Sequence, residues 1–522
     1  MSYAVHAGQV TQGIDYAAIA PPLLTAAAGI VALLADAFGL SRRAVGLVSW
    51  AGPAAGLAAV GVLAAGRPRA TFCLPSGLRA AVPSAGGPPA AGAARPPGLA
   101  SCSYVVDDFT LLFQGLVLAA ALAVLLLSYG EITRSRLPVG EYHFLLLAAV
   151  TGALALAAAR DLALLVVALE TLSLPVVALV ALRRYDGIAG ESALKLFLFT
   201  VVGTAVTLFG ISLVYGVTGA LHLDRVAAAL ARTPADLRPA AAAGVVLVLT
   251  GFAVKVAAVP FHFWAPDVYQ GAPLPVTAFL SVISKAGGFA GLAILLAAGF
   301  PAYARTWGVL IGVLAAVTMT VGNLVALRQR HAVRLLAWSS IAQSGYMLAP
   351  LSAGATGVRR LPEAVAATVA YVAIYAVMNL GAFSVVAAAA RRGAVVVDDY
   401  RGLARSEPAT AMALAFFLLC LAGLPPGVMG LFAKIVVIRA TVAGGMTWLA
   451  VVMAVNTVIG LSYYLGWAAR LFAPPAPGRA ATQGMDRTVG AAIAAAAAGA
   501  VVLSVVPQFV LHLRLPVSIL PG

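Results

Sequence analysis

The sequence is poor in charge. Only 10% of its 522 residues are charged, whereas 62% are hydrophobic and the mean hydropathy is +1.00. This composition is typical of a polytopic membrane protein, and no polar stretch is long enough to form a soluble domain. The net charge of +15 does not indicate nucleic-acid binding, because the arginines are scattered among membrane-flanking loops and no basic, aromatic surface is evident.

Cysteine and N-terminal positive charge are also scarce. The three cysteines, Cys73, Cys102 and Cys420, do not have metal-ligand spacing, so we expect no metal site. Cys73 and Cys102 share one long loop and would form a disulfide if that loop faces an oxidising compartment. The first basic residue is Arg42, so we expect no cleavable signal peptide, which would need a charged N-terminal region.

Lysine is nearly absent, and its few positions are unusual. Of the 33 basic residues only Lys195, Lys255, Lys285 and Lys434 are lysines, and each lies inside an apolar segment. Arginine stays protonated in essentially any protein environment, whereas a desolvated lysine can release its proton near neutral pH. Among the 18 acidic residues only Glu170 lies deep in an apolar run. These five residues suggest proton handling; the alternative is that arginine-rich codon usage removed the other lysines by chance.

Apolar runs long enough to cross about 30 Å of hydrocarbon predict an all-α membrane protein with about 14 transmembrane helices. The runs lie near 17–38, 44–66, 106–129, 142–159, 161–182, 193–219, 240–270, 274–298, 303–327, 332–351, 363–390, 409–440, 444–472 and 488–508. Two of them, 240–270 and 409–440, are overlong and contain proline. Each is predicted to form two half-helices around a break.

The spans group into four parts. Residues 1–141 should form three N-terminal helices, with a Pro/Ala-rich, irregular loop at 67–103. Residues 142–298 and 303–472 each contain five spans, including one broken helix, and an odd number of spans gives the two units opposite orientations. This is the inverted-repeat pattern of transporters. A last transmembrane helix lies within 473–522.

Arginine placement predicts the orientation. Tight clusters such as Arg42/Arg43 and Arg183/Arg184 follow odd-numbered spans, which places those loops in the cytoplasm and both termini outside. The polar patch at 221–239 should be a loop that includes an interfacial helix.

Residues 251–286 combine two of the lysines with a proline-broken, aromatic connection. Lys255 precedes Pro260 by five positions, and a break there frees backbone carbonyls that an ammonium or a water molecule can satisfy. Lys285 lies mid-span, too deep to reach the interface. Glu170 facing a lysine would make a pair that tightens or loosens as the lysine gains or loses its proton. The alternative is a neutral glutamic acid bonded to nearby backbone.

The remaining candidates have clearer structural alternatives. Lys195 could pair with Glu191, four positions earlier, and extend its amine to the interface. Lys434 follows a Pro-Pro-Gly break and would end a lysine relay. His262 is a further candidate because imidazole can shuttle protons, although its aromatic neighbours fit a packing role equally well. Asp267 is expected to cap the segment that follows it.

The segments VPFHFWAPDVYQGAPLPVTAFLSVISKA, LETLSLP, RLLAWSSIAQSGYM and GLPPGVMGLFAKI together resemble one family. They are similar to the proton-translocating subunits of NADH-quinone oxidoreductase (respiratory complex I) and their Mrp-type antiporter relatives, and most similar to the subunit N branch. The resemblance extends over roughly residues 105–475. It implies 14 helices with two inverted five-helix repeats.

The resemblance also implies roles for the residues that match its motifs. Glu170 and Lys255 correspond to the family's ion pair, Lys195 and Lys285 to its connecting lysines, and Lys434 to its distal-channel lysine. Where the family often has histidine, this chain has Gln343, so we expect water rather than imidazole to make the central connection there.

The function implied by this resemblance is proton translocation in the plasma membrane of a bacterium, coupled to quinone reduction in partner subunits. Flavin, iron–sulfur clusters and quinone are expected in those partners, and this chain is expected to bind no cofactor. The alternatives are a subunit of an Mrp-type Na⁺/H⁺ antiporter, a membrane hydrogenase subunit and a stand-alone solute carrier. A carrier would need a pocket with specific polar groups, and the apolar segments offer few besides lysine.

Overall fold

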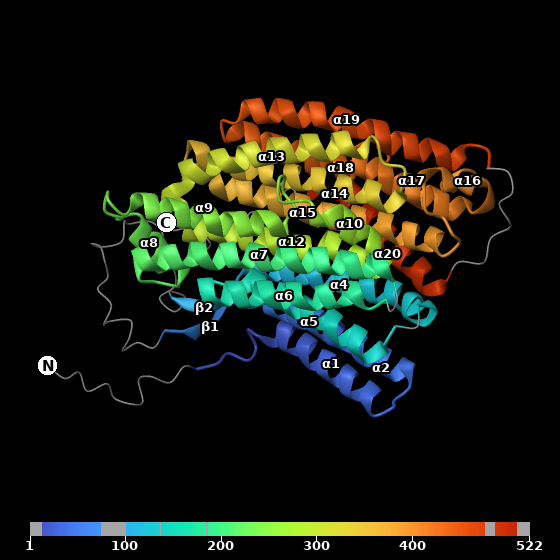
Figure 1. The fold of residues 1–522 in the computed structure, drawn as a ribbon, viewed down its shortest axis with the longest axis horizontal. Coiled ribbons are helices and arrows are strands. Elements are labelled where there is room, and N and C mark those ends of the chain that lie inside the picture. The colour runs from blue at the N-terminus through green and yellow to red at the C-terminus, as the bar shows by residue number, and fades with distance from the viewer. Residues whose placement is uncertain (1–12, 75–100, 136, 184–185, 476–485, 509–522) are drawn as a thin grey trace.

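The computed structural model describes residues 13–74, 101–135, 137–183, 186–475 and 486–508. Within these ranges the chain is a bundle of closely packed helices (Figure 1). Twelve helical segments are long and apolar enough to cross a membrane. They are α1 (Ala20–Ala37), α2 (Arg42–Ala64), α4 (Asp108–Arg134), α5 (Val139–Ala158), α6 (Leu162–Ala181), α7 (Gly187–Thr218), α9 (Arg238–Lys255), the segment Leu274–Gly299, α13 (Ala304–Ala326), α15 (Leu361–Ala390), α19 (Thr447–Phe472) and α20 (Arg487–Val505).

Two other predicted spans are made of shorter helices. One is α14 (Ala332–Leu348); the other, 409–440, is divided into α17 (Pro408–Ala422) and α18 (Val428–Ala443). The shortest helices are α8 (Leu223–Leu230), α10 (Trp264–Gly271) and α16 (Leu403–Ser406). Since α8 lies in the polar patch at 221–239, the helix expected there is confirmed.

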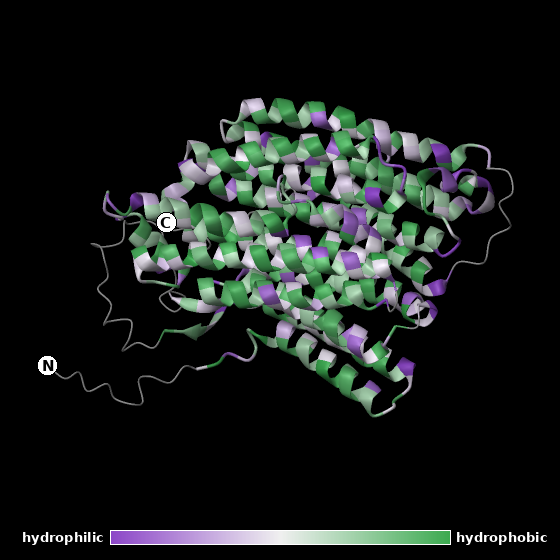
Figure 2. Ribbon diagram, viewed as in Figure 1, coloured by the Kyte–Doolittle hydropathy of each residue, from purple (hydrophilic) through white to green (hydrophobic). Residues whose placement is uncertain are grey.

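The segment Leu274–Gly299 lies at the centre of the bundle, and every residue from 275 to 299 is buried. It is not a regular α-helix: α11 (Leu274–Phe279) and α12 (Lys285–Ile294) alternate with π-helical turns at Leu280–Ser284 and Leu295–Gly299. Such π-turns are frequent at functional sites. Figure 2 shows hydrophilic residues at the helix ends and loops, with further ones in the interior of an otherwise hydrophobic bundle.

The first predicted break lies between α9 and α10, over residues 256–263. Ala257 has a φ of 56°, a left-handed conformation that is uncommon outside glycine. The freed carbonyls have partners: Trp264 Nε1 donates to the Val254 carbonyl at 3.0 Å, and Ser344 Oγ to the Val256 carbonyl at 2.8 Å. Side chains therefore replace the hydrogen bonds that the break removes.

Acidic side chains hold the starts of several helices. Asp107, Asp161, Asp186 and Asp486 each accept a hydrogen bond from a backbone N–H in the first turn of the helix that follows. A carboxylate at this position satisfies an orphan donor and complements the helix dipole.

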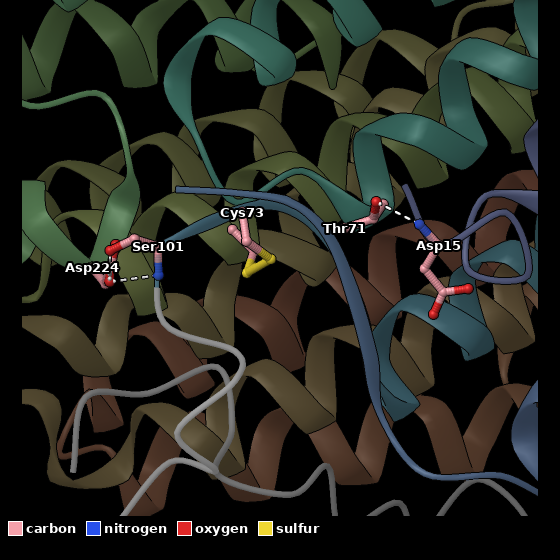
Figure 3. Close-up of a disulfide and its surroundings, with 6 residues drawn as sticks. Asp15, Thr71, Cys73, Ser101 and Asp224 are labelled. Carbon is pink, nitrogen blue, oxygen red and sulfur yellow. Dashed lines mark hydrogen bonds between the residues drawn. A yellow bond between two sulfur atoms is a disulfide. The ribbon is translucent and has the colours of Figure 1, made fainter. Parts of the chain in front are cut away.

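The flanks of the 67–103 loop are more regular than predicted. Strands β1 (Arg69–Cys73) and β2 (Cys102–Val106) pair antiparallel, and the Cys73–Cys102 disulfide joins them, which confirms the expected pairing (Figure 3). The prediction of an irregular loop was wrong here because cross-strand backbone pairing satisfies polar groups at the bundle end, a signal that Pro/Ala-rich composition does not reveal. Residues 75–100 lie outside the described ranges.

The β1–β2 hairpin is tied to distant parts of the chain (Figure 3). Asp15 N–H donates to Thr71 Oγ1 at 3.0 Å. The backbone N–H and hydroxyl of Ser101 donate to Asp224 Oδ2, in α8, at 3.1 and 3.0 Å. The segment preceding α1, the hairpin and α8 therefore lie at one end of the bundle.

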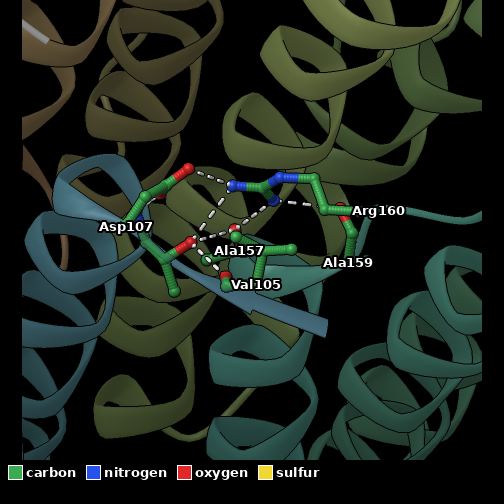
Figure 4. Close-up of polar contacts among 6 residues, drawn as sticks. Val105, Asp107, Ala157, Ala159 and Arg160 are labelled. Carbon is green, nitrogen blue, oxygen red and sulfur yellow. Dashed lines mark hydrogen bonds and ion pairs between the residues drawn. The ribbon is translucent and has the colours of Figure 1, made fainter. Parts of the chain in front are cut away.

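A buried ion pair anchors this end (Figure 4). Arg160 Nη2 donates to Asp107 Oδ2 at 2.9 Å, and the guanidinium also donates to the carbonyls of Ala157 and Ala159. Both side chains are at least 92% buried. Removing one partner of such a pair leaves an uncompensated charge.

We expect Asp107→Ala to lower the unfolding temperature in detergent by several degrees, because breaking a buried ion pair costs about 3–5 kcal/mol. The loss of the α4 cap adds to this effect. Asp108→Ala is the matched control, since Asp108 is the next residue and is exposed. Equal shifts for the two variants in a thermal unfolding assay would contradict a stabilising role for the Arg160 pair.

Candidate functional site

Glu170, Lys255 and Ser173 line one small cavity between α6, α7 and α9. The cavity volume is about 30 Å³, enough for one or two water molecules. Lys255, the last residue of α9, donates from Nζ to Ser173 Oγ at 2.7 Å. The hydroxyl of Thr204, on α7, donates to Glu170 Oε1. The two predicted members of the ion pair are therefore brought to the same cavity.

The pairing differs in detail from the sequence-based expectation. Glu170 and Lys255, both described, do not form a direct ion pair, because each binds a neighbouring hydroxyl instead. The sequence also predicted that an ammonium or a water molecule would satisfy carbonyls at the break. Two carbonyls there accept hydrogen bonds from the side chains of Trp264 and Ser344.

The same cavity extends to Ser284, the residue that precedes Lys285. Ser284 lines it, is 1% exposed, and its hydroxyl has no hydrogen-bond partner among the described residues. Ser284 ends the π-helical turn and Lys285 begins α12, so the two side chains leave adjacent backbone positions. The arrangement places a free hydroxyl between the Lys255 cavity and the next amine.

Lys285 is fully enclosed and held by the second half of the chain. It is 3% exposed, and its Nζ donates to both the carbonyl and the hydroxyl of Ser340, on α14, each at 2.6 Å. Tyr375 OH, on α15, donates to the same Ser340 hydroxyl at 2.7 Å. The ammonium also lies 5.6 Å from the centre of the Tyr375 ring.

A cluster of hydroxyl groups surrounds Gln343, one turn along α14 from Ser339. Tyr371 OH, on α15, donates to Gln343 Oε1, and Gln343 Nε2 donates to Tyr464 OH, on α19, at 3.2 Å. Ser339 and Tyr464 also share a hydrogen bond between their hydroxyls. Both amide atoms of Gln343 thus bind phenols, where the sequence predicted water.

Lys434 lies at the far side of this cluster. It is 5% exposed, and its Nζ donates to the Ala422 carbonyl at 2.6 Å, at the break between α17 and α18. Gly423 follows with a φ of 82°, and a Cβ there would lie 3.4 Å from the ammonium. Lys434 Nζ lies 5.7 Å from the Tyr346 ring, which stacks on Tyr371 at 6.1 Å.

Lys195 belongs to a separate network of charges. Its Nζ lies 2.7 Å from Glu191, which confirms that pair, and also 2.7 Å from Asp267. Asp267 binds Arg334, on α14, with its other oxygen at 2.7 Å. The Asp267 side chain lies inside the first turn of α10 and makes no cap, so the predicted capping role was wrong: two cations occupy its oxygens.

His262 lies in the first break, buried between aromatic rings. Its ring lies 5.2 Å from that of Trp338, on α14, and 4.5 Å from that of Phe263. These are packing contacts. Among the described residues, no three His, Cys, Asp or Glu side chains gather as metal ligands.

The sequence alone missed several polar partners. Ser173 lies three positions after Glu170, and Tyr375 four positions after Tyr371, so helical spacing within apolar runs could have revealed both. Thr204 and Tyr464 come from other helices, and only the packed structure brings them to the site.

Comparison with known proteins gives a consistent result. Residues 159–460 match the family described as NADH:quinone oxidoreductase/Mrp antiporter, TM. The chain is 50% identical over 499 residues to "NADH-quinone oxidoreductase subunit N 2" from Streptomyces griseus, covering 94% of this chain and 87% of that protein.

Two solved structures share the fold. A chain of respiratory complex I from Thermus thermophilus superposes with a TM-score of 0.72 at 30% identity, over 96% of this chain and all of that chain. A chain of the Mrp complex from Dietzia sp. superposes with a TM-score of 0.78 at 21% identity, covering 96% and 97% of the two chains. At that identity the second likeness concerns the fold alone.

Proposed function

Because this chain belongs to the NADH:quinone oxidoreductase/Mrp antiporter transmembrane family, we propose that it is the subunit N of an NADH-quinone oxidoreductase and moves protons through its interior. The observation that carries this proposal is the set of buried amines joined by hydroxyls across both halves of the bundle. Amines inside a membrane protein mark ion paths, and lysine, unlike arginine, can release its proton when desolvated.

The first step takes place in the Glu170–Lys255 cavity. A protonated Lys255 is attracted by the Glu170 carboxylate, and Ser173 and Thr204 position the two groups. When Lys255 loses its proton, that attraction ends. Ser284 offers the free hydroxyl through which water in the cavity would pass the proton toward Lys285.

The second step crosses from the first half to the second. Lys285 would give a proton to Ser340 Oγ, and Ser340 would release its own hydroxyl proton to the oxygen of Tyr375. This transfer requires the Tyr375 hydroxyl, which donates to Ser340 here, to turn and to pass its own proton to a water molecule on the side of Tyr371, so that each oxygen gains one proton and loses one. Tyr375 and Tyr371 lie one helical turn apart on α15, and Gln343 holds Tyr371 and Tyr464 in place. The amide of Gln343 does not change charge itself and acts by positioning these phenols.

The last step uses Lys434. The Ala422 carbonyl stabilises its charged form, and the Tyr346 ring lies between it and Tyr371. In this scheme His262 is an additional shuttle beside the first break. Lys195 sets the charge around Asp267 and connects the first unit to Arg334 in the second.

Redox chemistry belongs to the partner subunits, which would hold flavin, iron–sulfur clusters and quinone. The alternative is an Mrp-type Na⁺/H⁺ antiporter subunit, because the matching family model includes both groups of proteins. The 50% identity to a subunit N favours the first assignment. Sodium-dependent exchange in vesicles without an electron donor would support the antiporter instead.

The disulfide and the arginines support an orientation in a bacterial plasma membrane with both termini outside. Disulfides persist in oxidising compartments, so the β1–β2 hairpin would lie outside the cell. The segment before α1 binds that hairpin through Asp15 and would lie on the same side. The Arg42/Arg43 loop, at the other end of α1, would be cytoplasmic, which agrees with the positive-inside rule.

Lys255→Ala and Glu170→Ala should each reduce quinone-linked proton pumping in vesicles to less than about a tenth, the scale on which a proton-transferring side chain contributes. Lys255→Arg should also impair pumping, because arginine cannot cycle its proton. Arg232→Ala, at an exposed loop position, is the control. If the complex assembles and Lys255→Ala still pumps at the full rate, the proposed relay is wrong.

Tyr371→Phe and Tyr464→Phe each remove one hydroxyl from the Gln343 cluster and keep the ring. Each should slow pumping by roughly fivefold, the rate equivalent of one hydrogen bond of about 1 kcal/mol. Tyr215→Phe is the matched control, since Tyr215 is 50% exposed on α7. Unchanged initial rates in the Tyr371/Tyr464 double variant would exclude the phenols from the path.

A membrane-impermeant maleimide tests the orientation. After mild reduction of intact cells, the partly exposed Cys73 should be labelled without permeabilisation, whereas the buried Cys420 should not. The Cys73→Ser/Cys102→Ser variant gives the background. Labelling that appears only after the cells are permeabilised would reverse the proposed orientation.

A further inference from the structure

A groove with a volume of about 320 Å³ lies between α2, α4 and α5, beside the start of α20. Its lining residues include none of the lysines of the proposed relay. Its walls are mainly apolar, with Trp50, Leu125, Leu126 and Ile132 among them. Arg42 and Arg43 line the same groove. An apolar groove that ends at two cationic side chains matches an anionic lipid in both shape and charge.

The two arginines carry unneutralised charge. All 18 Asp and Glu residues lie in the described ranges, and none of them forms an ion pair with Arg42 or Arg43. Two other arginines near helix ends do have carboxylate partners: Arg391 binds Asp486 at 2.8 Å, and Arg470 binds Asp398 at 2.9 Å. The chain therefore supplies counter-charges elsewhere but not at this groove.

The position of these arginines increases the local positive potential. They are the first two residues of α2, a 23-residue helix with no acidic residue in its first turn. The start of a helix already carries partial positive charge, so two guanidiniums there are unfavourable unless an anion is close. An anion at this place would be stabilised by both the helix and the side chains.

A buried histidine provides a second, independent sign of a ligand. His143, on α5, lines the groove and is 6% exposed. Its Nδ1 has no hydrogen-bond partner among the described residues. A buried polar atom without a partner is costly, and a ligand oxygen in the groove would relieve that cost.

We propose that this groove binds one phospholipid with an anionic headgroup. The phosphate would lie against Arg42 and Arg43, and His143 would hydrogen-bond to oxygens of the headgroup or ester region. An acyl chain would pack on Trp50 and Leu125. Basic pockets between transmembrane helices bind anionic headgroups by this chemistry, and Trp and Tyr are enriched at the same depth. The assignment does not depend on the proton relay.

Photo-crosslinking can test the site directly. The full-length chain, purified with its accompanying subunits, would be placed in phosphatidylcholine nanodiscs with a trace of a diazirine-bearing phosphatidylglycerol. Peptides of α2 and α4 that line the groove should be labelled at low probe concentration. Arg42→Gln/Arg43→Gln should weaken this labelling by roughly thirtyfold, from the loss of two charge contacts.

Three controls separate the outcomes. Arg328→Gln/Arg330→Gln removes two other exposed, closely spaced arginines and should leave labelling unchanged. A diazirine-bearing phosphatidylcholine should label the groove weakly, with no effect of the Arg42/Arg43 change. Gly46→Leu should also reduce labelling while keeping both arginines, because Gly46 lines the groove and a Cβ there meets no atom within 4 Å.

Two results would overturn the proposal. Equal labelling by both probes, unaffected by either substitution, would mean that the groove holds only bulk lipid. Labelling by neither probe, in a preparation whose other lipid-facing helices are labelled, would mean that a protein partner covers the groove.

Discussion

Every charged group and every freed backbone carbonyl inside the hydrocarbon must find a partner within the protein, and the two helix breaks show how this chain meets that constraint. At the first break Trp264 and Ser344 donate to backbone carbonyls, whereas Lys255 binds Ser173 and lines a small cavity with Glu170. At the second break the Ala422 carbonyl binds Lys434. The same constraint therefore produces one amine held by side chains and one held by backbone.

The polar side chains buried between these amines carry mostly hydroxyl groups. Serines of α14 and tyrosines of α15 and α19 surround Gln343. Hydroxyls donate and accept at once, so they can form continuous chains without adding a charge to the hydrocarbon. The buried central segment, residues 275–299, gives these groups a rigid wall that no lipid reaches.

Much of this arrangement could be predicted from the sequence, because the signals are local. The lengths of the apolar runs gave most helices to within a few residues, and the prolines located both breaks. The restriction of lysine to apolar segments identified the amines that the structure buries or pairs. The partners of these buried groups could not be predicted, since Ser340 reaches Lys285, Thr204 reaches Glu170 and Tyr464 reaches Gln343 from other helices. The role of Asp267 was predicted wrongly for the same reason. Its two ion-pair partners, Lys195 and Arg334, lie on α7 and α14.

The two hydrogen bonds of Lys285 both end on a single residue, Ser340, which belongs to the other half of the chain. A sliding movement between α12 and α14 would therefore release both bonds together. The ammonium would then be either doubly held or not held at all, with no half-bound state between. This geometry ties the amine at the centre of the bundle to the second half of the chain through one residue.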